Sequence, residues 1–132
     1  MKLHLGPAIG AAIIATSLLS FLPASAQMAA DQLKVAYQAG RNQLGVVEYC
    51  QGKGYVGPEA IDTQRKLLGM IPAPADISGG DAAEAKGKQG IVSAMGIEQD
   101  LDSAAKKQST TSADLCKKMG DALKQAAAAL PK

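Results

Sequence analysis

The two cysteines of this 132-residue sequence, Cys50 and Cys116, are the residues with the clearest chemistry. A redox-active pair usually takes the form Cys-x-x-Cys, and a zinc site needs about four ligands, so two distant thiols fit neither role well. An even number of cysteines in an exported chain favours a structural disulfide. We therefore expect Cys50 and Cys116 to be bonded to each other.

Export is indicated by the first 26 residues. Lys2 and His4 precede an apolar run from Leu5 to Leu22, and the small residues Ala24-Ser25-Ala26 follow it. This is the pattern of a secretory signal peptide with its cleavage site. A retained membrane anchor is the alternative, but two glycines and a proline interrupt the run. We expect cleavage after Ala26 and a single domain over residues 27–132, located in the periplasm or secreted.

Three neighbouring carboxylates, those of Glu98, Asp100 and Asp102, could form a calcium site or an acid–base cluster. On a helix, however, positions i, i+2 and i+4 do not share one face. We therefore interpret these residues as part of a solvated helix surface, paired with Lys106 and Lys107 one turn further on. The sequence predicts neither a metal site nor a cofactor.

Nucleophilic catalysis has little support, because the exported part of the chain contains no histidine that could serve as a base. Ser93 lies near Lys86 and Lys88 in the sequence, but no Ser/Lys motif surrounds it. The stretch Gly87-Lys88-Gln89-Gly90 lacks both the Walker spacing and a preceding strand, so it is not a phosphate loop. We predict a non-enzymatic protein without catalytic residues.

The exported part is nearly neutral and poor in large side chains. Without Lys2 it carries 13 basic and 12 acidic side chains, and its only aromatic residues are three tyrosines. This composition excludes a nucleic-acid partner, which would require a basic stripe and aromatic side chains for stacking. Leu, Ile, Val and Phe make up about 17% of the part, near the level at which chains fail to form a core. A disulfide is therefore physically useful.

Apolar residues that recur three, four or seven positions apart predict four helices. These helices cover Ala29 to Gln51, Pro58 to Met70, Asp81 to about Gln108, and Thr111 to Leu130. Glycines interrupt the third helix, so we expect a kink or two separate parts there. No run of residues alternates with a period of two for long enough to predict a strand.

The positions of the cysteines suggest how these helices are arranged. Cys50 lies at the end of the first helix, and Cys116 lies in the first turn of the fourth, which a capping box at Thr111 to Asp114 begins. A bond between them places those ends side by side and predicts that the two helices run antiparallel. We predict an all-α fold, a small four-helix up-down bundle, with a looser three-helix packing as the alternative.

Several segments resemble a known group of proteins. They are Gln43 to Cys50, Leu67 to Pro74, Lys86 to Gly90 with Ser93 to Gly96, and Leu115 to Met119. They are similar to small exported proteobacterial proteins labelled as pore-forming members of the early-secreted-antigenic-target (ESAT-like) family. The resemblance covers nearly the whole exported part and implies a helical, exported protein with a membrane-permeabilising role. It assigns no functional residue, because the Trp-any-Gly turn of the parent family has no counterpart here.

The sequence thus predicts an exported, non-enzymatic helical protein that acts by association, with copies of itself or with a membrane. Membrane action would require several amphipathic helices to assemble, since no apolar run after the leader approaches the roughly 18 residues of a span. The alternatives are a periplasmic carrier of a small ligand, with Tyr37, Tyr49 and Tyr55 lining its pocket, and, less favoured, an enzyme.

Overall fold

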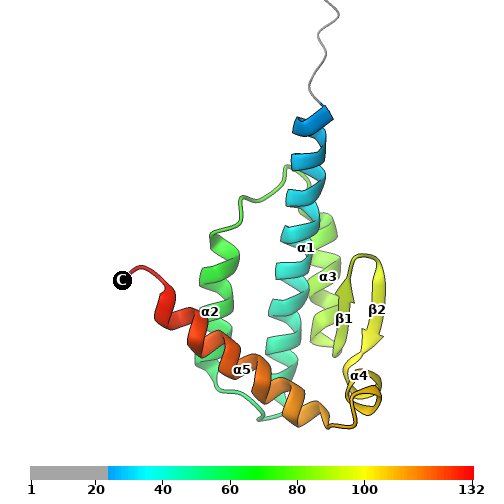
Figure 1. Cartoon of the computed structure of the whole chain (residues 1–132), viewed down its shortest axis with the longest axis vertical. Coiled ribbons are helices and arrows are strands. Elements are labelled where there is room, and N and C mark those ends of the chain that lie inside the picture. Colours follow the sequence, from blue (N-terminus) through cyan, green and yellow to red (C-terminus); the bar gives the residue numbers. More distant parts are fainter. Residues whose placement is uncertain (1–23) are drawn as a thin grey trace, which may run out of the picture.

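Five helices and one β-hairpin make up residues 24–132, the part of the chain that this computed structural model describes (Figure 1). In chain order they are α1 (Ala24–Gly52), α2 (Pro58–Gly69), α3 (Ser78–Lys88), β1 (Ile91–Ala94), β2 (Ile97–Asp100), α4 (Leu101–Lys107) and α5 (Ser112–Ala129). The leader predicted over residues 1–26 lies outside the described residues, except for its last three, which belong to α1.

The central helix is α1, and α3 packs closely along it because glycines face each other at the contact (Figure 1). A Cβ on Gly87 would stand 2.8 Å from the amide nitrogen of Val46 and 2.9 Å from the Cα of Gly45. About two turns earlier on α3, a Cβ on Gly80 would stand 2.6 Å from the ring of Tyr37. The absence of these side chains is therefore what allows the two backbones to approach.

The helix predicted from Asp81 to about Gln108 is divided into two parts, α3 and α4, as its glycines suggested, but the predicted absence of strands is wrong, because a hairpin separates the two parts. The helix α3 ends at Lys88, and Gly90 then takes a φ of +80°. Met95 and Gly96 have φ values of 50° and 78°, the left-handed pair that a two-residue type I′ turn requires. The chain therefore folds back as a hairpin before α4 begins.

The hairpin strands are short and antiparallel. Ile91 lies opposite Asp100 at one end of the ladder, and Ala94 lies opposite Ile97 at the turn. Four residues per strand are too few for a period of two to stand out from a helical pattern. The signal available in the sequence was the glycine at the second turn position, which follows a segment rich in β-branched residues.

The disulfide forms between Cys50 and Cys116 as predicted, with their Cα atoms 5.6 Å apart. It joins the end of α1 to the first turn of α5. However, α5 crosses the lower parts of α1 and α2 obliquely instead of running antiparallel beside α1 (Figure 1). The fold is mainly helical, but the up-down bundle of four helices is wrong, because the hairpin and α4 occupy the residues expected to form the rest of the third helix.

The buried apolar residues form two small clusters that meet at the disulfide region. One cluster contains Val46, Cys50, Leu101 and Cys116, and the other contains Val47, Ala60 and Leu123. Val56 and Met119 pack against both clusters and connect them. Both cysteines are fully buried, so the disulfide is part of the core packing. Closing a loop of 66 residues, it stabilises the fold by roughly 4 kcal/mol in the chain-entropy model.

Hydrogen bonds from side chains fix the starts of the last two helices. The hydroxyl of Thr111 accepts a bond from the amide of Asp114 at 3.1 Å and donates one to the carboxylate of Asp114 at 2.7 Å, which confirms the predicted start of α5. The carboxylate of Asp100 accepts from the amide of Ser103 at 2.7 Å and caps α4 in the same way. The helix α2 begins at Pro58, also as predicted.

The glycine contact between α1 and α3 can be tested by adding a methyl group. We expect Gly87→Ala to lower the free energy of unfolding by about 1 to 3 kcal/mol, because the new Cβ would press on the backbone of α1. Gly52→Ala is the matched control, since nothing lies within 4 Å of a Cβ there, and it should be neutral or stabilising by up to about 1 kcal/mol. Urea unfolding measures both, and equal losses would contradict this packing.

Candidate functional site

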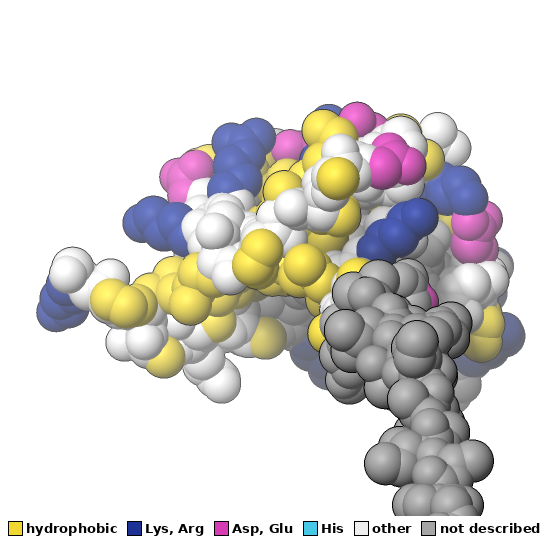
Figure 2. Space-filling model, turned by 90° about the horizontal axis from the view of Figure 1, so that it is seen from above, with side chains coloured by type: hydrophobic (Ala, Val, Ile, Leu, Met, Phe, Trp, Pro, Cys, Tyr) yellow, Lys and Arg dark blue, Asp and Glu magenta, His cyan; other side chains and the backbone are white. Residues whose placement is uncertain are grey.

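The C-terminal half of α5 projects beyond the rest of the molecule and carries mostly alanine (Figure 1). Seen from above, hydrophobic side chains continue from this end of α5 toward the middle of the molecule (Figure 2). Ala127, Ala128 and Ala129 are all exposed. This surface borders a groove, the first of two candidate sites.

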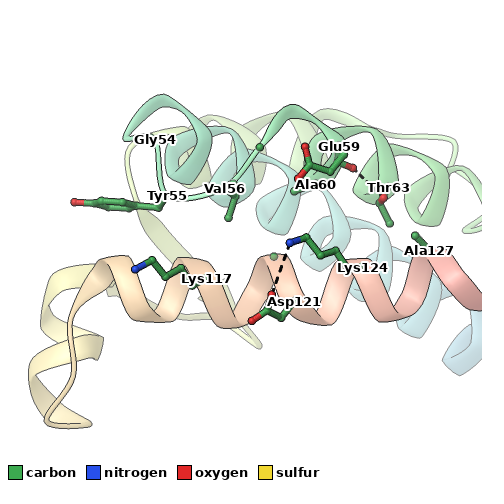
Figure 3. Close-up of a pocket in the computed structure, with 12 residues that line it drawn as sticks. Gly54, Tyr55, Val56, Glu59, Ala60, Thr63, Lys117, Asp121, Lys124 and Ala127 are labelled. Atoms are coloured by element: carbon green, nitrogen blue, oxygen red, sulfur yellow. Dashed lines mark hydrogen bonds and ion pairs between the residues drawn. The ribbon is translucent and has the colours of Figure 1, made fainter.

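The groove lies between α2 and α5 and has a volume of about 630 Å³ (Figure 3). At its floor α5 touches the segment before α2, because a Cβ on Gly120 would stand 2.9 Å from Cγ1 of Val56. The lining combines apolar and polar side chains, among them Tyr55, Val56, Glu59, Ala60, Thr63, Lys117, Asp121, Lys124 and Ala127. Since α5 crosses α2 obliquely, the two helices form an open wedge here.

The groove carries charges of both signs. Lys117, Lys124 and Asp121 come from α5, and Glu59 comes from α2 (Figure 3). Asp121 is 4.0 Å from the ammonium group of Lys124, a loose pair between two exposed side chains. The carboxylate of Glu59 folds back against Gly57, at the start of α2. The groove is therefore lined by two ammonium groups and two carboxylates, whose charges balance.

The second candidate site is the tip of the hairpin, residues 94–97. All four residues are exposed, and the side chains of Met95 and Ile97 are 88% and 70% exposed. Beside the tip is a hollow of about 240 Å³ whose walls include Val35, Ala39 and Met95. An apolar projection and an apolar hollow thus lie next to each other.

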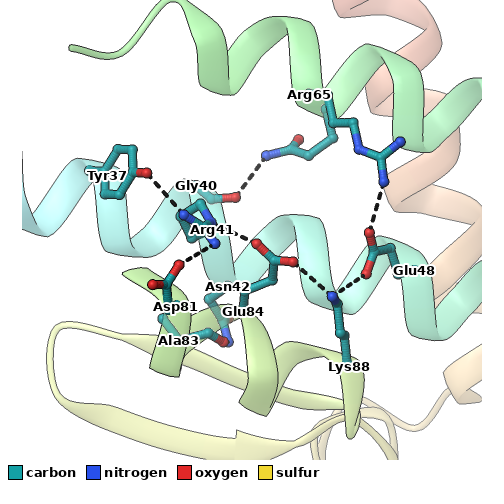
Figure 4. A network of polar contacts seen from close by, with 11 residues as sticks. Tyr37, Gly40, Arg41, Asn42, Glu48, Arg65, Asp81, Ala83, Glu84 and Lys88 are labelled. Atoms are coloured by element: carbon teal, nitrogen blue, oxygen red, sulfur yellow. Dashed lines mark hydrogen bonds and ion pairs between the residues drawn. The ribbon is translucent and has the colours of Figure 1, made fainter. Parts of the chain in front are cut away.

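A network of ion pairs holds the middle of α1 against α3 and α2 (Figure 4). Arg41 donates to Asp81 and to Glu84 at 2.6 Å each, and to the hydroxyl of Tyr37 at 2.9 Å. Lys88 lies 2.8 Å from Glu84 and also pairs with Glu48, which reaches Arg65 on α2. This chain of alternating charges fixes the relative positions of three helices.

The pKa values in this network keep the charges in place. Burial acts to raise the pKa of Glu84, but hydrogen bonds from Lys88 and Arg41 outweigh burial and lower it below its ordinary value. The hydrogen bond to Glu84 raises the pKa of Lys88. These groups are therefore held ionised at neutral pH, whereas a general acid needs a raised pKa and a basic lysine a lowered one.

The side chain of Asn42 fixes the hairpin to the helices. It is 2% exposed, and its amide nitrogen donates to the carbonyl oxygens of Ala83 and Ile91 at 2.9 Å each. Its carbonyl oxygen accepts from the backbone amide of Ser93 at 2.8 Å. The carboxamide thus satisfies the outer edge of β1 as a neighbouring strand would.

The three predicted carboxylates do not lie on one helix surface. Glu98 is on β2 and pairs with Lys86 of α3, Asp100 caps α4, and Asp102 bonds to the hydroxyl of Ser112. These three carboxylates thus make their contacts in the hairpin and at the starts of α4 and α5, instead of the predicted pairs with Lys106 and Lys107. Residues 24–132 contain no group of three or more His, Cys, Asp or Glu side chains arranged to hold a metal ion.

The other residues considered for chemistry are also separated. Ser93 lies opposite Glu98 in the hairpin, and its hydroxyl is buried without a hydrogen-bond partner in the described part of the chain. Tyr37 bonds to Arg41, Tyr49 lies under Lys53 at 5.4 Å, and Tyr55 lines the groove. The structure does not bring the three tyrosines together in one pocket. The sequence predicts Lys117, with Lys118, as part of a solvated helix surface and does not place Lys117 or Lys124 at a groove; their spacing of seven residues, which puts both on one side of a helix, was the available signal.

Comparison with known proteins identifies no relative of this chain. No protein-family model, curated protein or solved structure matches this chain. The two candidate sites therefore depend on the geometry of this chain alone. None of the helices within residues 24–132 combines the length and the hydrophobicity of a membrane span.

The ionised state of Glu84 predicts a dependence of stability on pH. Because the pKa of Glu84 is lower in the folded chain, its stabilisation is complete above the unfolded value, about 4.3, and is lost as the pH falls through the folded value. We expect Glu84→Gln to cost about 1 to 3 kcal/mol at pH 7 and less at pH 3, because the wild-type chain loses part of this stabilisation below about pH 4.3. Urea unfolding at the two pH values measures this.

Asp62→Asn serves as the control for this experiment, because Asp62 is an exposed carboxylate on α2. Its effect should stay within about 0.5 kcal/mol at both pH values. A cost of Glu84→Gln that is the same at pH 7 and pH 3 would contradict the role assigned to the ion pairs.

Proposed function

We propose that this protein is an exported, non-enzymatic helical protein that acts by association, and that its first partner is a second copy of the same chain. The observation that carries the proposal is the hairpin tip, where Met95 and Ile97 are 88% and 70% exposed. The exported part has few large aliphatic side chains, and its core is correspondingly small. Two such side chains held in water forgo the stabilisation of burial unless another surface covers them.

A second copy of the chain fits this surface because the exposed side chain of Met95 lies beside the apolar hollow. In a dimer with a twofold axis, each Met95 can enter the hollow of the other copy, so that both contacts form at once. The flexible methionine side chain adapts well to such a contact. At the rim, the ion pair of Lys86 and Glu98, each 45% exposed, offers both signs of charge to the same pair in the partner.

We propose a non-enzymatic role because the polar side chains with shifted pKa values stabilise the fold. Glu84 and Lys88 hold helices together as an ion pair. Asp100 caps α4, and Asp114 forms the capping box of α5 with Thr111; hydrogen bonds from Ser103 and Thr111, respectively, lower their pKa values. Groups used in this way maintain the fold, and none of the four is poised to exchange a proton near neutral pH.

Membrane permeabilisation enters the proposal from the resemblance to the ESAT-like family. Amphipathic helices that act on a bilayer need neighbours to enclose their polar faces. Self-association through the hairpin tip would supply such neighbours. We therefore treat permeabilisation as a property to be tested on the assembled protein.

Self-association can be tested by removing the apolar side chains of the tip. We expect the purified chain from Gln27 to Lys132 to dimerise, and the double variant Met95→Ser/Ile97→Ser to raise the dimer dissociation constant at least about tenfold, because each buried side chain contributes roughly 1.5 to 3 kcal/mol. Sedimentation equilibrium over a concentration series measures it. Met70→Ser is the matched control, because Met70 is an exposed methionine (64%) outside the hairpin tip.

A monomer at all concentrations, or equal weakening by Met70→Ser, would contradict the proposed interface. The same proteins should then be added to anionic vesicles loaded with dye, at neutral and acid pH. Dye release by the wild-type chain that the double variant loses would support permeabilisation by the assembly. No release at micromolar protein would remove this part of the proposal.

Export can be tested directly by mass spectrometry of the protein recovered from its own host. We expect the mass of a chain that begins at Gln27 and has lost two hydrogens at Cys50 and Cys116. Reduction and alkylation should then add two labels. A mass that includes the leader, or free thiols before reduction, would contradict the proposed exported form.

A further inference from the structure

We propose that a hollow between α1 and α2 binds a neutral, mostly apolar small molecule that carries one N–H or O–H donor. The hollow has a volume of about 260 Å³, and its walls include Ala36 and Gly40 of α1 and Gln64 and Leu67 of α2. It is a different site from the groove between α2 and α5 and from the hairpin tip. The inference does not depend on self-association, so either proposal can fail without the other.

Small residues on α1 leave this space open. Ala36, Ala39 and Gly40 all line the hollow, and their spacing places them on one face of the helix. A Cβ on Gly40 would stand 3.0 Å from Cδ1 of Leu68, so Leu68 rests almost on the backbone of α1. Beside this contact, α1 has no large side chain that fills the gap. The volume is below the range of about 300 to 1,000 Å³ that is typical of drug-sized ligands, so the ligand is smaller than these.

The lining favours an uncharged ligand. Among the residues that the structure describes, the lining has no lysine, arginine, aspartate or glutamate, and most of its members are apolar. An ion that entered the hollow would lose hydration without gaining a partner of opposite charge. An apolar molecule, in contrast, gains free energy by covering the partly exposed side chains of Leu67 and Leu68.

The carboxamide of Gln64 is the polar feature of this site. Gln64 is 3% exposed, and its Nε2 donates to the carbonyl oxygen of Gly40 at 3.2 Å. This bond fixes which end of the carboxamide is nitrogen, because a carbonyl oxygen only accepts hydrogen bonds. The other end, Oε1, is buried and has no hydrogen-bond partner within the described part of the chain. Buried acceptors are normally satisfied, so Gln64 brings an unused acceptor to the lining.

A donor on the ligand would satisfy this oxygen. Because Gln64 belongs to the lining, a molecule in the hollow lies against its side chain. One N–H or O–H group then bonds to Oε1, and the rest of the molecule covers the apolar walls, the usual division of roles in a small-ligand site. The buried carboxamide of Asn42 differs in this respect, because its oxygen already accepts from the amide of Ser93 at 2.8 Å.

Indole is the probe for this site, because it is neutral and has a small apolar ring system with one N–H donor. Benzofuran is its control, since it has the same shape but an oxygen atom in place of the N–H group. We expect the protein, expressed from the full chain in its own host, to bind indole saturably. Benzofuran should bind about three- to tenfold more weakly, the effect of one lost hydrogen bond.

The chain contains no tryptophan, so the fluorescence of indole reports its binding directly, and benzofuran is measured by competition. If indole shows no saturable binding, the hollow is not a ligand site. If both molecules bind equally, the unpaired oxygen takes no part in recognition. Either result would overturn the proposal.

A pair of glutamine variants tests the acceptor. Gln64→Met removes Oε1 and keeps a side chain of similar length, so it should weaken indole about three- to tenfold and leave benzofuran unchanged. Gln43→Met, at an exposed glutamine of the same lining, is the matched control and should keep the preference for indole. Equal weakening of both ligands by Gln64→Met, or loss of the preference in Gln43→Met, would contradict the assigned hydrogen bond.

A second pair of variants locates the site without changing Gln64. Ala36→Leu places a larger side chain in the lining and should weaken both ligands at least about tenfold, because it takes up the space that the ring system needs. Ala30→Leu, at an exposed residue of the same helix outside the lining, should leave binding unchanged. Helical circular dichroism of each variant shows that the fold is retained. Equal binding by these two variants would contradict the proposed position of the ligand.

The hairpin tip is the remaining place where indole could bind, because Ala39 also borders the hollow beside the tip. Both ligands are therefore also measured with the double variant Met95→Ser/Ile97→Ser. Its affinity for indole should equal that of the wild-type chain, whether or not it still self-associates. A loss of binding in this variant would place indole at the tip and overturn the assignment to the hollow between α1 and α2.

Discussion

The Cys50–Cys116 disulfide lies inside the hydrophobic core, and the direction in which α5 leaves that core depends on it. Its sulfur atoms occupy space that large aliphatic or aromatic side chains fill in richer cores, and Val46 and Leu101 pack around them. The bond also holds the first turn of α5 against the end of α1. With that end fixed and Gly120 in contact with Val56, α5 leaves the body at an oblique angle. The groove is the space that this angle leaves open.

The helix α1 connects the other half of the structure to this core. Along α1, Gly45 admits α3, Arg41 binds acidic side chains of α3, and Asn42 satisfies the edge of β1. Buried polar groups are costly when unpaired, so the full use of the Asn42 carboxamide favours one position of the hairpin over others. The hairpin tip is thereby held on a rigid support although its own strands are short. One central helix thus supports two different surfaces, an apolar tip and a groove with charges of both signs.

The sequence predicted the helices best where caps and breakers mark their ends. Pro58 and the Thr111 capping box placed the starts of α2 and α5, and the cysteine pair was predicted from its number and context. The prediction failed between Lys88 and Leu101, where Gly90 and Gly96 were interpreted as residues that kink or divide a helix. Both are instead residues with positive φ, which end α3 and form the hairpin turn. A glycine indicates that such a conformation is permitted, but its neighbours in space decide whether it is adopted.

The candidate sites show the same division between features that the sequence predicts and features that depend on the tertiary structure. By itself the sequence determined that the chain is mainly helical, that Cys50 and Cys116 pair, and that large aliphatic side chains are scarce, because these properties follow from local periodicity, cysteine count and composition. Only the tertiary structure decided that Met95 and Ile97 face solvent and that Lys117 and Lys124 border a groove. Exposure and the formation of a groove depend on the angle at which α5 crosses its neighbours and on the approach of α3 to α1. Both result from contacts between residues far apart in the chain, which no local pattern records.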